Sequence, residues 1–293
     1  MRRNSTLVRL STAGLLALGL ALTLPARAQG TVGVDPVARL FDAVPGQTIT
    51  QVLNIYNPNP DPQPLRVSAY LSDMDISEVG ETSYLPAGSL PESLKNWITF
   101  SPTALDLAGQ QSQEVRYTVQ VPANAAPGTH WIMLMLEGQD PAPKPGQTLA
   151  AFRLRVAHTI YVNIAPIKRV GSIVGIFDQL PKTAEGAYTI GVQYSNAGNV
   201  VSGVQGRVEL RGADGELAAT LPLNLDVALP GHTLLLQASL SGPLPKGQYS
   251  ALVVLNDGDQ GRDLLGEHVL SLPFDLAAPP PLPAPAEGQG SKP

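Results

Sequence analysis

Two stretches of the chain gather carboxylates closely enough to suggest a cation site. One runs through residues 73–81 and begins with Asp73 and Asp75, and the other runs through residues 256–263. A calcium loop needs a glycine at its sharp turn and a closing glutamate at a fixed spacing. In the first stretch Gly80 stands at the wrong position and no glutamate closes the loop. The second begins Asn-Asp-Gly, which is typical of a solvated turn. We therefore expect no metal at either stretch, with calcium as the alternative.

Signatures of catalysis are missing from the sequence. The four histidines, His130, His158, His232 and His268, form no His-Glu-x-x-His pair and do not cluster. There is no Gly-x-Ser-x-Gly elbow, no phosphate-binding glycine loop and no dinucleotide-binding fingerprint. The absence of cysteine excludes thiol catalysis, thiolate metal sites and iron–sulfur clusters. We predict no catalytic residue and no cofactor, and hence a protein that is not an enzyme.

Two tryptophans, Trp97 and Trp131, lie next to segments with a strand pattern. Aromatic side chains in a β protein usually fill the core, and we expect this of both. An exposed platform for carbohydrate is the alternative for either residue.

The first 28 residues have the features of a secretory signal peptide. Arg2 and Arg3 precede an apolar run at residues 13–24, and Ala26-Arg27-Ala28 offers small residues where a signal peptidase needs them. We expect a mature chain that begins at Gln29, is secreted to the periplasm or cell envelope, and has no membrane span after cleavage. The formal net charge of −5 argues against nucleic-acid binding, which depends on clustered lysine and arginine.

The elements that carry these residues are predicted to be short strands joined by turns. Apolar and polar residues alternate at 115–121 and at 188–194, the period of a strand with one buried face. The same strand-and-turn order occurs twice. We predict an all-β protein with two tandem immunoglobulin-like β-sandwich domains, residues 29–166 and residues 167–276. The proline-rich residues 277–293 are predicted to form a disordered tail.

The last strand of the first domain is predicted to be unusually long. Apolar residues keep one phase over about 13 positions, against a typical five or six for a strand. They are Phe152, Leu154, Val156, Ile160, Val162 and Ile164. A strand of this length overhangs a sandwich or exposes an edge, and partner strands add to such edges. We predict a partner-binding edge strand; a strand that is paired internally along the whole sandwich is the alternative.

Several segments of the first domain follow an order that resembles the N-terminal domain of PapD-like periplasmic pilus chaperones. They are residues 34–41, 53–57, 100–107, 115–122, the strand that begins at Trp131, Asp140-Pro141 and the long last strand. The stretch from Pro127 to Trp131 is also similar to peptidoglycan-associated surface proteins that interact with WxL proteins and share a two-sandwich plan. The chaperone resemblance covers most of residues 31–165.

The chaperone resemblance implies a boomerang of two sandwiches that lends a strand edge to an unfinished partner. In that family an arginine on the first strand and a lysine on the last strand of domain one bind the partner's terminal carboxylate. Arg39 lies on the first strand and is the possible clamp residue. Thr159, Tyr161 and Asn163 occupy the last strand where the lysine is expected.

The sequence thus predicts an exported, non-enzymatic protein that binds other envelope or surface proteins, such as pilus-like subunits. The favoured mechanism is that of a chaperone-like assembly factor acting through its edge strand. The alternative is a cell-surface adhesion protein or a peptidoglycan-associated scaffold, which would contact cell-wall polymer through its loops.

Export is tested by the mass of the mature protein. We expect cleavage after Ala28, which leaves Gln29 as the first residue, because the small residues of the site follow the apolar run at the usual spacing. Intact-mass spectrometry of the exported protein measures this. An N-terminal segment retained in the exported material would contradict the prediction.

Overall fold

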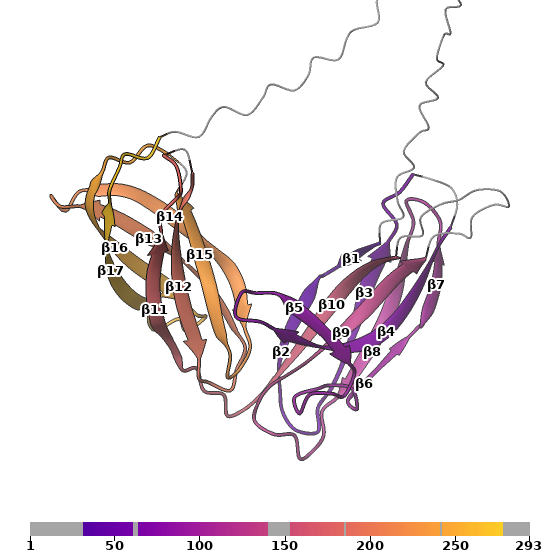
Figure 1. The fold of residues 1–293 in the computed structure, drawn as a ribbon. Coiled ribbons are helices and arrows are strands. Elements are labelled where there is room, and N and C mark those ends of the chain that lie inside the picture. Colours follow the sequence, from indigo (N-terminus) through magenta and orange to yellow (C-terminus); the bar gives the residue numbers. More distant parts are fainter. Residues whose placement is uncertain (1–31, 61–63, 140–152, 185, 241, 278–293) are drawn as a thin grey trace, which may run out of the picture.

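The computed structural model describes residues 32–60, 64–139, 153–184, 186–240 and 242–277. These residues form 17 strands and no helix, so no helix among them is long and apolar enough to cross a membrane. The predicted signal peptide with its cleavage site, Asp140-Pro141, Phe152 and the tail beyond Ala277 lie outside the described residues. The all-β prediction with two immunoglobulin-like sandwiches is confirmed, and Figure 1 shows the sandwiches as the two arms of a V.

The first sandwich is built from the strands before residue 165. Its strands are β1 (Gly33–Asp35), β2 (Ala38–Ala43), β3 (Thr48–Tyr56), β4 (Leu65–Ile76), β5 (Thr82–Pro86), β6 (Ile98–Ser101), β7 (Ala104–Leu107), β8 (Ser112–Gln120), β9 (Gly128–Gln139) and β10 (Arg153–Ile164). One sheet has the order β1-β3-β8-β6, and the other has the order β2-β10-β9-β4-β5, with β7 paired to β4. From Val115 on, every second side chain of β8 is buried, as its alternating sequence requires.

The second sandwich follows a short connection at residues 165–170. Its strands are β11 (Gly171–Gln179), β12 (Tyr188–Asn196), β13 (Ser202–Gly212), β14 (Leu217–Ala228), β15 (Thr233–Leu240), β16 (Gly247–Asn256) and β17 (Leu264–Leu272). The sheets have the orders β11-β12-β15 and β14-β13-β16-β17. The Asn-Asp-Gly sequence at the end of β16 forms a turn in which the Gly258 amide donates to Asn256 Oδ1 over 3.0 Å.

The first strand of the chain changes sheets at Pro36. Before it, β1 pairs antiparallel with β3, and after it, β2 pairs parallel with β10. Proline has no amide hydrogen to donate to a ladder, so it is suited to the point where one pairing ends. This crossing brings β2 beside the last strand of the first sandwich.

Strand β9 is apolar on both faces because both faces are covered. It lies between β10 and β4, and its inward side chains join the core of the first sandwich. Its outward side chains, including Trp131 and Met133, form a separate apolar cluster with Val201 and Leu229 of the second sandwich. Trp131 is 3% exposed and its indole Nε1 donates to the Met74 carbonyl over 2.9 Å. Trp131 is therefore a core residue of the junction, not a carbohydrate platform.

The junction is completed by a hairpin that leaves the sheet. Strand β4 separates from β9 after Ser72, and residues 92–94 take its place beside Trp131. The hairpin of β4 and β5 extends to β15 of the second sandwich (Figure 1), where the Leu235 amide donates to the Glu78 carbonyl over 2.6 Å. We call residues 73–86 the bridging hairpin.

The buried carboxylate of Asp73 holds the base of the bridging hairpin. Its Oδ2 accepts from the amides of Gly88 at 2.9 Å and Leu90 at 3.1 Å, and its Oδ1 accepts from the Ser93 hydroxyl at 2.6 Å. Asp75 Oδ1 lies 2.8 Å from His232 Nε2 of the second sandwich. The carboxylates of Asp73 and Asp75 thus make separate structural contacts instead of converging on one point.

We expect Asp73→Ala to lower the free energy of unfolding by about 2 kcal/mol, because partly buried donors lose their acceptor. The amide of Leu235 should then exchange with deuterium faster, because the bridging hairpin is no longer held. Urea unfolding and hydrogen exchange measure these effects. Asp73→Asn, which keeps one acceptor oxygen, is the control, and its free energy of unfolding should fall by less than that of Asp73→Ala.

The protein without substitutions should show no change in melting temperature when EDTA or calcium is added, because the Asp73 carboxylate accepts from amides and a hydroxyl. A fall of several degrees with EDTA would contradict this assignment.

Candidate partner-binding edge

Strand β10 has two neighbours of unequal length. It pairs with β9 from Arg153 to Ile164, but with β2 only from Thr159 to Ile164. Among the described residues, no strand pairs with residues 153–158 on the side away from β9. We call these six residues the open edge.

The hydrogen-bonding direction of the open edge follows from its register. The Thr159 amide donates to the Val37 carbonyl over 2.9 Å, on the β2 side. Because amide directions alternate along a strand, the amides of Arg155 and Ala157 also face the open side, and that of Val156 faces β9. The open edge therefore has backbone amides that can donate to a partner strand, and these amides are not the ones that bond to β9.

The predicted apolar face of β10 is divided into two parts. Leu154 is 40% exposed and Val156 is half-buried, whereas Ile160, Val162 and Ile164 are fully buried. The last three lie in the core and are flanked by strands on both sides, so they cannot accept a partner strand while β2 is in place. The sequence predicted one continuous edge over residues 152–164. In the structure β2 pairs with residues 159–164, so of the described residues only 153–158 are left without a strand on that side.

The open edge ends at a buried histidine. His158 Nδ1 lies 2.7 Å from the Pro36 carbonyl and therefore carries the hydrogen, and Nε2 accepts from the Tyr117 hydroxyl at 3.1 Å. Burial lowers the pKa of His158; the Pro36 hydrogen bond opposes this shift and the charge of Arg39 adds to it. Burial likewise raises the pKa of Tyr117 to about 12. His158 thus fastens the chain crossing at Pro36 to the core.

Arg39 lies on β2 opposite Ile160. Its Nη1 donates to Gln51 Oε1 over 2.8 Å, while its Nε is buried and has no partner among the described residues. This arginine therefore faces the side of the sandwich that carries Gln51, and it sits just beyond the open edge.

At the β10 positions where the resemblance implies a lysine, Asn163 is hydrogen-bonded and Tyr161 is packed in an apolar cluster. Asn163 donates to Asp42 Oδ1 over 2.9 Å and accepts from the Thr129 hydroxyl at 2.6 Å. Tyr161 is packed against the apolar cluster of the junction, and burial raises the pKa of its phenol. Neither side chain supplies a cation beside Arg39.

Two features of this region were not anticipated from the sequence. The charged face of the open edge is held by Glu137, whose Oε2 accepts from Arg155 Nε at 2.8 Å and from the Tyr70 hydroxyl at 3.2 Å. The outer side of β2 is a second edge without a paired strand in the described part of the chain, and Leu40 on it is 52% exposed. The proline at residue 36, which splits the first strand, is the sequence signal that could have indicated this edge.

No protein-family model and no curated protein matches this chain. Similar solved chains include one from a chaperone–tip adhesin complex of CFA/I fimbriae biogenesis, with 12% identity, a TM-score of 0.43, and coverage of 83% of this chain and 99% of that one. A second belongs to the Salmonella enterica SafA pilin–SafB chaperone complex, with 14% identity, a TM-score of 0.41, and coverage of 82% and 96%. A third is the Pseudomonas aeruginosa CupB2 chaperone, with 14% identity, a TM-score of 0.39, and coverage of 82% of this chain and 99% of that one. These three solved chains are matched over 96–99% of their own length.

The buried state of His158 predicts a loss of stability in acid. The unfolded chain takes up a proton on this histidine near its ordinary pKa of about 6.5, whereas the folded protein resists it because the pKa is lowered. Stability is therefore complete above about pH 6.5 and decreases as the pH falls below that value.

We expect His158→Gln to reduce the slope of unfolding free energy against pH, between pH 6.5 and 5, by up to about 1.4 kcal/mol per pH unit. Urea unfolding at several pH values measures it. His232→Gln, at a partly exposed histidine of the junction, is the control. An unchanged slope in the His158 variant would show that this histidine does not titrate differently in the two states.

Proposed function

We propose that the protein is a non-enzymatic envelope protein that captures a strand of a partner protein on its open edge. The observation that carries the proposal is the unequal pairing of β10, which is complete with β9 and begins only at Thr159 with β2. A partner strand placed there would extend the sheet into the space that β2 leaves open.

The chemistry of strand addition fits the two faces of the open edge. The amides of Arg155 and Ala157 supply backbone hydrogen bonds, which give affinity with little regard to sequence. Leu154 and Val156 lie on alternate positions and offer two apolar contacts that set the register. The crossing at Pro36 and Val37 ends the available edge, so the captured segment is short, about six residues matched to residues 153–158.

The proposed partners are secreted or surface proteins with an unpaired sheet edge, such as pilus-like subunits. The signal-peptide pattern at residues 1–28 supports an encounter in the periplasm or cell envelope. Arg39 is proposed as a secondary anchor for a partner carboxylate, supported by its position beside the end of the open edge. Its contribution should be modest, because no lysine of β10 stands beside it.

The proposal is tested by recovering partners from the protein's own envelope extract with a tagged mature chain and identifying them by mass spectrometry. Ala157→Pro should abolish recovery and leave the fold intact, because it removes a donor from the open side only. Leu154→Asp should also abolish it. Leu265→Asp is the control, because Leu265 is an exposed leucine on β17, an edge strand of the other sandwich.

Backbone exchange provides a second readout. The amides of Arg155 and Ala157 should exchange quickly in the free protein and slowly with a partner bound, whereas that of Val156 should be slow in both. Val156→Pro should destabilise the sheet, because it removes a bond of the β9 ladder. Slow exchange of Arg155 and Ala157 in the free protein would contradict an open edge and favour the scaffold alternative.

A further inference from the structure

Three polar side chains lie in a row across the larger sheet of the first sandwich, where it meets the second. Asp42 on β2 is paired in register with Asn163 on β10, and Asn163 is paired with Thr129 on β9. Asn163 Nδ2 donates to Asp42 Oδ1 over 2.9 Å, and the Thr129 hydroxyl donates to Asn163 Oδ1 over 2.6 Å. We call Asp42, Asn163 and Thr129 the polar row.

The chemistry of the groups fixes the direction of these hydrogen bonds. A carboxylate only accepts, so Asn163 must turn its Nδ2 toward Asp42 and its Oδ1 toward Thr129. The Thr129 hydroxyl must then donate to Asn163, which leaves its oxygen to accept from a donor elsewhere. That donor is the backbone amide of Val201, just before β13 of the second sandwich, at 2.8 Å. The polar row thus ends on the second sandwich, and each bond orients the group that makes the next.

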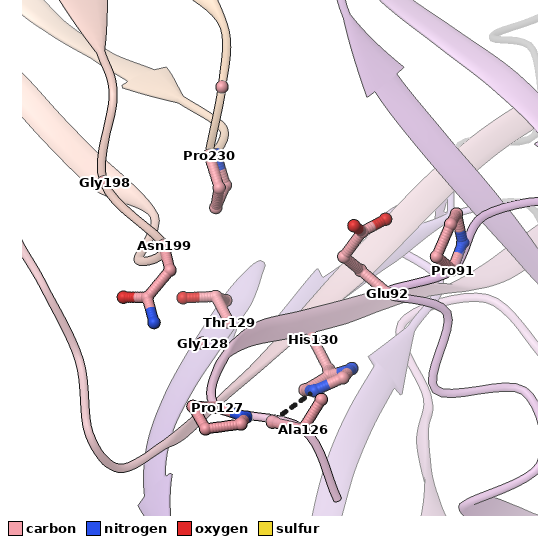
Figure 2. A pocket seen from close by; sticks show the side chains of 11 residues that line it. Pro91, Glu92, Ala126, Pro127, Gly128, Thr129, His130, Gly198, Asn199 and Pro230 are labelled. Carbon is pink, nitrogen blue, oxygen red and sulfur yellow. Dashed lines mark hydrogen bonds between the residues drawn. The ribbon is translucent and has the colours of Figure 1, made fainter.

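Thr129 contacts the second sandwich through its backbone as well. Its amide donates to the Asn199 carbonyl over 2.8 Å, and Figure 2 shows the two residues side by side at the junction. Gly128 has φ of +121°, and a Cβ there would lie 2.7 Å from the same carbonyl oxygen, so glycine is required. Asn199 is joined to the connection between the sandwiches, because its Oδ1 accepts from the Lys168 amide and its Nδ2 donates to the Pro166 carbonyl.

The centre of the polar row is shielded from water. Thr129 is 2% exposed and Asn163 is 3% exposed, whereas Asp42 is exposed. A buried polar group that loses its partner is not rescued by water, so the loss is costly. Neighbouring hydrogen bonds in such a chain also strengthen one another. A break at one end of the polar row therefore weakens the bond at the other end.

We propose that the polar row couples the seating of the second sandwich to the attachment of β2 on β10. With Val201 seated on Thr129, the Thr129 hydroxyl is turned toward Asn163, and Asn163 holds Asp42 of β2. When the second sandwich moves away from Thr129, this hydroxyl is free to rotate and β2 is held less tightly. The effect is reciprocal, because a coupling free energy between two sites acts equally in both directions.

This coupling regulates the open edge, and in that respect it rests on the proposed strand capture. Strand β2 covers residues 159–164 of β10, so the tightness of β2 decides whether the edge stops at residue 158. A partner protein that also contacts the second sandwich and shifts it would loosen β2 at a distance. The second sandwich would then control the edge without touching the captured strand.

Asp42→Ala tests the coupling from the β2 end, in the mature protein without a partner. We expect the Val201 amide to exchange with deuterium about threefold faster, because Asn163 no longer fixes the Thr129 hydroxyl that accepts from it. Asp42→Asn is the matched control, because it removes the charge and keeps an acceptor oxygen for Asn163. Its Val201 exchange rate should be unchanged. Asp42 is exposed, so neither substitution disturbs the core.

Thr129→Val tests the coupling from the other end. The Tyr161 amide faces β2, because amide directions alternate along the strand from Thr159, and it should exchange about threefold faster. The Ile160 amide faces β9 and should change less, which separates a loosened β2 from a general loss of stability. Thr129→Ser keeps the hydroxyl and should retain the slow Tyr161 rate.

An unchanged Val201 rate in Asp42→Ala, or an equal acceleration in Asp42→Asn, would overturn the proposal. Equal acceleration of Tyr161 and Ile160 in Thr129→Val would overturn it as well. Because no partner strand takes part in these measurements, such a failure leaves the proposed strand capture unaffected.

Discussion

The arrangement of the two sandwiches depends on one buried carboxylate. A strand that leaves its sheet exposes backbone groups on itself and on the neighbour it abandons, and both must find partners. Asp73 meets this need directly after the last β4–β9 pair, because it accepts from two amides and a hydroxyl of the segment that follows the hairpin. The bridging hairpin can then reach β15, and the outward side chains of β9 can be buried against the second sandwich instead of meeting water.

The pairing of strands also explains the open edge. Strand β10 is long because β9 supports all of it, but the first strand of the chain is divided between two sheets and can cover only half of β10. His158 and the crossing at Pro36 mark the boundary, since the imidazole joins the crossing to the core hydroxyl of Tyr117. Leu154 and Ile160 lie on the same face of β10. Leu154 is exposed and Ile160 is buried, and β2 runs beside Ile160 but not beside Leu154.

The open edge offers backbone donors and two apolar side chains, so it selects for an unpaired strand. The polar row joins the strand that limits this edge to the second sandwich, because β2 carries Asp42 and the Val201 amide donates to Thr129. Asp73 supports the same junction, because it holds the chain that takes the place of β4 beside β9.

The sequence by itself determined the fold class, the two sandwiches and the alternation of β10, because period-2 patterns record which face of each strand is buried. It also placed His158 on the buried face and Trp131 in a core. It could not determine which strands pair, since alternation describes the faces of a strand and is silent about its edges. The open edge and the separate contacts of Asp73 and Asp75 were decided by tertiary structure alone. Each of them arises where segments distant in the chain meet. A local sequence pattern does not predict which hydrogen bonds are made to a segment that is distant in the chain.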